Sequence, residues 1–241
     1  MKNIKKLFLA GIATASLLTT TTSALAAARS NEAIDYLYKN PALGNLTAGF
    51  YVGQSEREIS RSGPLPDTSM TSSRGYAYLG YDLAPWLNVY GLLGGNQAKL
   101  AGTPSADAEM LLGVGVSMNL LNHFVREPTP MEDAFRINAD VRLISTKADF
   151  LFNSVTWQEL SASLRFSLVN FPEGSKDYRP EAIALYAGPA FSYIQSSDIE
   201  SKDQLGMVGG LEIFFYDALS VDLNVEYIGA TGFFAGVNFR F

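Results

Sequence analysis

The residues of this chain that could do chemistry are charged side chains that alternate with apolar ones. Successive side chains of a β-strand point to opposite faces, so this spacing puts the charges on one face and the apolar residues on the other. Charges on an enclosed face must be paired and hydrogen-bonded, because an ion stripped of water is costly to bury. The alternation assigns these residues to the enclosed face: Asp82, Glu109, Arg136, Asp140, Arg142, Glu159, Arg165, Glu212, Asp222, Glu226 and Arg240.

Ten segments have the two-residue period that would position these charges. The clearest, 219–227, places Leu, Val, Leu, Val and Tyr on one face and Ser, Asp, Asn and Glu on the other. An alternative with eight strands would treat two weaker segments as loops. The ten predicted strands are 45–56, 73–84, 87–97, 107–119, 134–147, 156–169, 182–195, 204–215, 219–229 and 231–241.

The length of these segments favours a transmembrane antiparallel up-and-down β-barrel over a soluble β-protein. Each runs eleven residues or more, whereas soluble strands average about five to six. At ~3.4 Å per residue and ~40° tilt, eleven residues rise about 28 Å, close to the ~25 Å apolar band of an outer-membrane barrel. The alternative is a secreted soluble sandwich or lipocalin with its apolar face inward.

An even number of strands would place both ends of the barrel domain, 45–241, on the periplasmic side. The last strand then orients the others. The connections 84–86, 120–133, 170–181 and 216–218 are predicted to be periplasmic. Those at 57–72, 98–106, 148–155, 196–203 and 229–231 are predicted to be extracellular.

The first 26 residues have the pattern of a cleaved secretory signal peptide. Lysines at 2, 5 and 6 precede an apolar run over 7–18, and Ala24-Leu25-Ala26 supplies the small-x-small cleavage pattern, with Ala28 as a competing site. Residues 27–44 would form a periplasmic segment. Within it, 30–39 has the spacing of a short helix that would rest on the barrel mouth, enter it, or fray.

Composition excludes several classes of protein. The chain has no Cys, and therefore no disulfide and no thiolate metal site. Beyond the leader there is no apolar run long enough for a spanning helix. The net charge of −6 becomes more negative without the three leader lysines, which argues against a nucleic-acid surface.

Aromatic residues near the segment ends are predicted to form two girdles at the membrane interfaces. Such rings suit a position where one side is apolar and the other is wet. The alternative is a set of core aromatics in a soluble fold. The predicted girdle residues are Trp86, Phe135, Phe215 and Tyr216 at the periplasmic side, and Phe150, Phe152, Trp157, Tyr193, Tyr227 and Phe233 at the outer side.

The last nine residues, FFAGVNFRF, end on Phe241 after a strictly alternating strand. This closing strand resembles the terminal signal of bacterial outer-membrane β-barrels. Residues 45–241 as a whole resemble the small barrels related to the transmembrane domain of outer membrane protein A. The resemblance implies an outer-membrane location with lipid and lipopolysaccharide as partners. It also implies recognition of Phe239 and Phe241 by the barrel-assembly machinery, and it leaves the molecular task undecided.

The enclosed charges allow two interpretations of the function. In the first, four arginines and seven carboxylates form cross-strand pairs that largely fill the lumen, and the barrel contributes to envelope integrity or surface interaction. In the second, they line a narrow porin-like channel, in which excess carboxylate would favour cations. We expect the first.

An enzyme acting on lipid or peptide is the weakest interpretation. Barrel enzymes commonly use a histidine base, and the one histidine, His123, falls in a predicted periplasmic connection with no Ser–carboxylate partner pattern. The acidic segment 196–203 offers oxygen ligands but matches no known cation loop. We therefore expect no catalytic residues, no metal and no cofactor.

Overall fold

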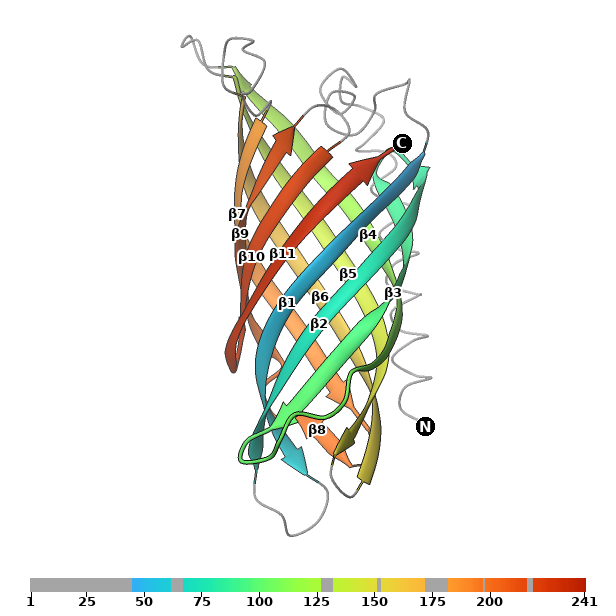
Figure 1. Cartoon of the computed structure of the whole chain (residues 1–241). Coiled ribbons are helices and arrows are strands. Elements are labelled where there is room, and N and C mark those ends of the chain that lie inside the picture. Colours follow the sequence, from blue (N-terminus) through green and yellow to red (C-terminus); the bar gives the residue numbers. More distant parts are fainter. Residues whose placement is uncertain are drawn as a thin grey trace, which may run out of the picture.

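One closed antiparallel sheet makes up the part of the chain that the computed structural model describes (Figure 1). Its first strand, β1 (Leu46–Arg61), pairs with its last, β11 (Ala230–Arg240), which closes the barrel. Between them lie β2 (Thr68–Ala84), β3 (Leu87–Leu100), β4 (Glu109–Arg126), β5 (Glu132–Phe150), β6 (Asn153–Phe171), β7 (Ala182–Gln195), β8 (Ile199–Ser201), β9 (Leu205–Phe215) and β10 (Leu219–Ile228). The described residues are 45–61, 67–126, 132–150, 153–171, 182–196, 198–215 and 219–241.

Ten of these strands form the barrel body, and each pairs with its neighbours along the chain, with β7 followed by β9. The predicted ten-stranded up-and-down barrel is therefore confirmed. At one end, the Phe241 backbone N–H donates to the Leu46 carbonyl at 2.9 Å. We call this the proximal end, and the opposite end, which carries β8, the distal end (Figure 1).

Several strands are longer than the sequence predicted. β5 and β6 have 19 residues each and stay in register from Glu132↔Phe171 to Phe150↔Asn153. The predicted ends were set where the alternation of apolar and polar residues stops. Backbone pairing between β5 and β6 continues beyond those points, because each added residue pairs with one on the other strand. For the same reason His123, predicted in a connection, lies within β4 opposite Phe135.

The short strand β8 is a departure from prediction, because it lies in a segment expected to be a loop. It pairs with the end of β1 through Ile59↔Ser201 and with the end of β7 through Gln195↔Glu200. The β10–β11 hairpin turns at Gly229, whose φ is +72°, before β1 and β2 reach the distal end (Figure 1). β8 thus fills the gap left by β9–β11, and the wall narrows distally from ten strands to eight.

Aromatic rings inside the barrel lie over glycines of the neighbouring strand. In each case ring and glycine are paired across the strands, and a Cβ added at the glycine would collide with the ring. The missing side chain lets the ring lie flat against the wall rather than across the lumen. These pairs are Tyr51/Gly236, Phe234/Gly53, Tyr78/Gly49, Tyr90/Gly115 and Tyr186/Gly210.

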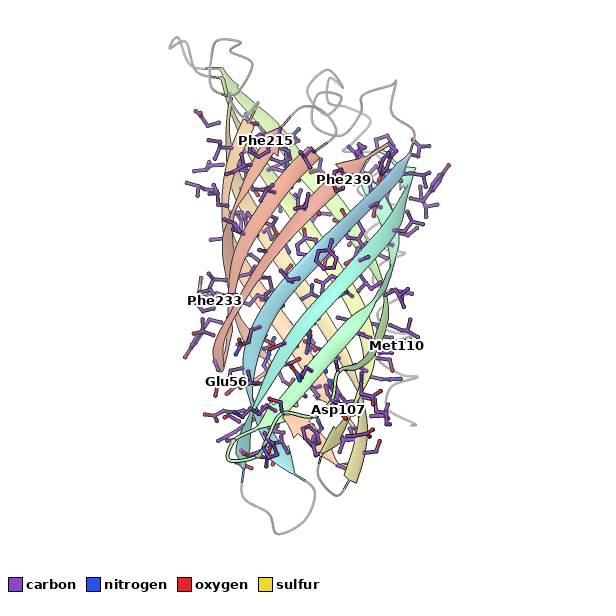
Figure 2. All side chains as sticks on the ribbon, in the orientation of Figure 1. Glu56, Asp107, Met110, Phe215, Phe233 and Phe239 are labelled. Carbon is purple, nitrogen blue, oxygen red and sulfur yellow. The ribbon has the colours of Figure 1, made fainter. Side chains whose placement is uncertain are left out.

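The outer surface of the barrel is apolar (Figure 2). Leu79, Leu168, Met207 and Phe233 are each more than 60% exposed, whereas Asp222 on an inward face is 2% exposed. Within the described residues, no helix is long and apolar enough to cross a membrane.

The predicted girdle residues do not all lie on this surface. Tyr227 and Phe233 are exposed on the outside. Tyr193 is partly exposed and donates to Glu200 at 3.1 Å, and Phe135 and Phe215 are partly exposed. Trp86 lies in the β2–β3 turn. The predicted leader 1–26, the segment 27–44 with its helix, and Phe152 and Tyr216 lie outside the described residues.

Replacing Gly236 by Ala should destabilise the barrel, because the added Cβ would push the Tyr51 ring off the wall. Overpacking of this kind costs about 1–3 kcal/mol. The measurement is the unfolding midpoint of refolded protein by circular dichroism. Gly91→Ala is the control, since Gly91 faces outward and its added Cβ would find only the Gly113 carbonyl oxygen, 4.0 Å away. Equal losses in both variants would contradict this role of the glycine.

Candidate functional site

An apolar cluster fills the distal end of the barrel interior. Its largest member, Trp157, is 1% exposed. The cluster draws on β1, β2, β3, β5, β6, β7 and β8, so nearly every strand of the narrowed ring contributes. Phe150 packs against it. We call it the distal cap: Ile59, Met70, Ala98, Leu100, Ala106, Ala148, Val155, Trp157, Ile194 and Ile199.

The distal cap corrects two of the girdle predictions. Trp157 and Phe150 were expected on the lipid side, but both point inward. Trp157 is two residues from Glu159, and Phe150 is two from Ala148, so each shares the inward face of its strand. The alternation contained this information, whereas position near a segment end did not.

A layer of buried ion pairs lies directly proximal to the cap. Glu159 is its centre: its carboxylate oxygens lie 2.5 Å from Arg74 Nη2 and 4.0 Å from Arg57 Nη2. Glu226 lies 3.8 Å from Arg57 Nη2 and 3.4 Å from Arg142 Nη2. We call these five residues the charge layer.

Neutral groups complete the charge layer. Glu159 accepts hydrogen bonds from the hydroxyls of Ser192 at 2.9 Å and Ser161 at 3.3 Å. Arg57 donates to the Ile228 carbonyl at 3.3 Å, and Arg74 Nε donates to Ser72 Oγ at 2.9 Å. Burying a charge is costly unless it is paired and hydrogen-bonded, and these contacts offset that cost for the charge layer.

Two members of the charge layer, Arg57 and Arg74, were missed by the sequence analysis. Arg57 lies one residue beyond the predicted end of the first strand, in what was expected to be a loop. Arg74 lies inside a predicted strand and shares its inward face with Asp82, eight residues on, so the alternation could have found it. Continuing the two-residue period past position 56 would have found Arg57 too.

A cavity of about 280 Å³ occupies the proximal half of the barrel. Its floor includes Arg142 and Glu226 of the charge layer, and it reaches the β2–β3 turn at Trp86. Four tyrosines line one wall, with ring centroids 5.7 Å apart for Tyr51–Tyr76 and 5.9 Å for Tyr78–Tyr90.

The predicted charges that do not belong to the charge layer lie elsewhere in the barrel. Asp82 pairs with Arg240 at 2.7 Å. Arg136 is 2% exposed, with its Cζ 5.8 Å from the Phe214 ring centroid. Glu109 is at the distal rim, 4.0 Å from Lys147 Nζ. The remaining three carboxylates accept hydrogen bonds from hydroxyls: Asp140 from Tyr90, Asp222 from Tyr186 and Glu212 from Ser220. Arg165 lies over the Tyr186 ring.

The distal rim carries exposed ion pairs. Lys202 Nζ lies 3.2 Å from Glu58 and 3.5 Å from Asp67. The hydrogen bond and charge of Glu58, with the charge of Asp67, raise the pKa of Lys202. Such exposed pairs contribute little to stability, but they tie the residue after β8 to β1.

Among the described residues, no group of three or more His, Cys, Asp or Glu could hold a metal ion. His123 is exposed near the proximal end of β4 and does not line the cavity. Along the barrel axis, the distal cap, the charge layer and the cavity follow one another from the distal to the proximal end.

No protein-family model matches the chain, and no curated protein matches it. Several solved structures align with most of the chain at low identity and with TM-scores below 0.5. An outer membrane channel from Pseudomonas putida is 10% identical, with a TM-score of 0.44 over 83% of this chain and 96% of that one. The β-domain of a Bordetella autotransporter is 13% identical, with a TM-score of 0.44 over 82% and 100%. The translocator domain of the autotransporter NalP from Neisseria meningitidis is 10% identical, with a TM-score of 0.41 over 92% and 98%. Identity this low carries no information about function.

Glu159→Gln should destabilise the folded barrel strongly, because it leaves Arg57 and Arg74 buried without their shared carboxylate. Removing one partner of a buried pair costs about 3–5 kcal/mol. Glu58→Gln is the matched control, since it removes a half-exposed partner of Lys202 and should cost less than about 1 kcal/mol. Unfolding midpoints in one detergent compare them, and similar losses would show that the charge layer does not support the fold.

Proposed function

We propose that the chain is a bacterial outer-membrane barrel, with lipid and lipopolysaccharide around its apolar outer surface. The shortest body strands are β10, with 10 residues, and β9 and β11, with 11 each. At ~3.4 Å per residue and ~40° tilt they rise about 26–28 Å, the height of an outer-membrane apolar band. The longer strands then project beyond the membrane. With the chain end at the periplasm, the distal end is extracellular.

In this proposal the barrel is non-enzymatic and closed, and it contributes to envelope integrity or surface interaction. The observation that carries the proposal is the succession of distal cap and charge layer. Trp157, Arg74 and Glu159 are each no more than 5% exposed, so apolar packing and ion pairs fill the distal lumen. Small barrels are commonly filled by side chains in this way.

A narrow channel is the second candidate, and the proximal cavity favours it. The cavity already occupies half of a conducting path, and Glu226 and Arg142 at its floor would act as selecting charges if the distal half opened. The two candidates therefore differ in one property, which is conduction through the distal cap.

Planar-bilayer recording of the refolded protein should show no discrete current steps. Folding would first be verified by a heat-dependent gel shift and by circular dichroism. Glu226→Gln should lower the unfolding midpoint and remain silent, because in a closed barrel this residue pairs with Arg57 and Arg142. Reproducible steps in the wild type, with ion selectivity altered in Glu226→Gln, would instead establish the channel.

Phe241→Ala should lower the amount of barrel assembled in the outer membrane, because the closing aromatic strand is the proposed contact for the barrel-assembly machinery. Phe241 is 55% exposed, and its ring lies 6.4 Å from that of Phe239, so both are accessible at the proximal end. Phe50→Ala is the control, a phenylalanine of similar exposure, 52%, on β1 and outside the closing segment. Heat-modifiable protein in outer-membrane fractions gives the readout, and equal levels of both variants would count against recognition of Phe241.

A further inference from the structure

The proximal cavity contains charges that are not paired with one another, unlike the charge layer. The guanidinium of Arg165 lies on its wall. Its contact is the ring of Tyr186, with Cζ 5.1 Å from the ring centroid. Its Nε is buried and has no hydrogen-bond partner within the described part of the chain, and no described carboxylate forms an ion pair with it.

Two carboxylates on the same wall are held by neutral groups. Asp140 accepts a hydrogen bond from the Tyr90 hydroxyl at 2.7 Å, and Glu212 accepts one from Ser220 Oγ at 2.8 Å. Neither forms an ion pair with a described residue. Beside the ion pairs Asp82–Arg240 and Arg142–Glu226, the cavity lining thus includes one cation and two anions that form no ion pair with a described residue.

Strand register keeps these unpaired charges close. Asn138 on β5 lies opposite Arg165 on β6, and Asp140 is the next inward residue after Asn138. Arg165 and Asp140 are therefore diagonal neighbours, with Cα atoms roughly 7–8 Å apart by the usual geometry of paired strands. Long side chains can reach across that distance, but no ion pair joins Arg165 and Asp140, so a small molecule that carries both charges can contact each of them.

The rest of the wall suits an organic ligand. Tyr51, Tyr76, Tyr78 and Tyr90 offer an aromatic surface. The Tyr51 and Tyr76 rings are stacked, the Tyr51 and Tyr78 rings are tilted, and the Tyr78 and Tyr90 rings meet edge to face. Glycines opposite three of the four hold the rings against the wall. A volume of about 280 Å³ is near the lower end of small-molecule sites. Buried charges without partners are costly, and a ligand that supplied both counter-charges would relieve that cost through charge-assisted hydrogen bonds.

We propose that the proximal cavity binds a small zwitterion, with its anionic group on Arg165 and its ammonium on Asp140. The tyrosine wall would accept an apolar side group. An amino acid and the phosphoethanolamine headgroup of a lipid share this chemistry. The proposal goes beyond the closed barrel and depends only on the cavity, so current through the distal end would leave it unaffected.

Calorimetric titration of the protein in lipid nanodiscs, which leave both ends accessible, would test the site. L-phenylalanine should bind at least tenfold more tightly than 3-phenylpropionate or phenethylamine, each of which lacks one of the two charges. O-phosphoethanolamine is the second zwitterion, and tighter binding of it than of phenylalanine would point to the lipid source. No binding of either zwitterion, or equal binding of phenylalanine and its singly charged analogues, would overturn the proposal.

Variants separate recognition from folding. Arg165→Gln should weaken phenylalanine binding at least tenfold. It removes the contact with the Tyr186 ring but breaks no ion pair with a described residue, so the unfolding temperature should fall less than in Glu159→Gln. Arg165→Lys keeps the charge and should lose less. Asp140→Asn should weaken binding of phenylalanine but not of 3-phenylpropionate. Lys202→Gln on the distal rim is the control and should bind as the wild type does. Wild-type affinity in both Arg165 variants would refute the site.

Discussion

The antiparallel pairing of β1 with β11 is the constraint on which the rest of the structure depends. It runs from Thr47↔Arg240 to Ser55↔Gly232 and removes the free edges that an open sheet would leave. Once the sheet is closed, every strand has one face toward the lumen and one away from it. Apolar side chains can then cover the outside continuously, while polar and charged residues must find partners in a narrow interior.

Closure alone would leave the distal end open, because β9, β10 and β11 are shorter than the strands on the opposite wall. The three residues of β8 fill that gap and reduce the ring from ten strands to eight. The smaller ring brings Ile59, Trp157, Ile194 and Ile199 into one apolar cluster. The charge layer lies directly proximal to this cluster. There the low dielectric of the packed cap strengthens the ion pairs and raises the cost of breaking them.

Charged side chains make different contacts in the two halves of the lumen. In the distal half each arginine of the charge layer has a carboxylate within 4.0 Å. In the proximal half Arg165 rests on a tyrosine ring, while Asp140 and Glu212 accept hydrogen bonds from hydroxyls. Glycines opposite the tyrosines keep the rings flat against the wall. A filled distal end thus adjoins a roomier proximal end, in which Arg165, Asp140 and Glu212 form no ion pair with a described residue.

The sequence by itself determined the ten body strands and the inward placement of charges such as Asp222 and Glu226, because a two-residue period is a local property of the chain. The length of these segments, and not their alternation, favoured the antiparallel barrel over a soluble sandwich. The alternation also places Trp157 and Phe150 on the inward face, whereas the strand ends and β8 depended on which segments become neighbours. The interaction partners of the inward charges also depend on the tertiary structure. Alternation places Glu159 and Arg165 on the same inward face of β6. Only the tertiary structure shows that Glu159 pairs with two arginines, whereas Arg165 lies over a tyrosine ring. Contacts between residues far apart in sequence are set by register and curvature, which no local pattern contains.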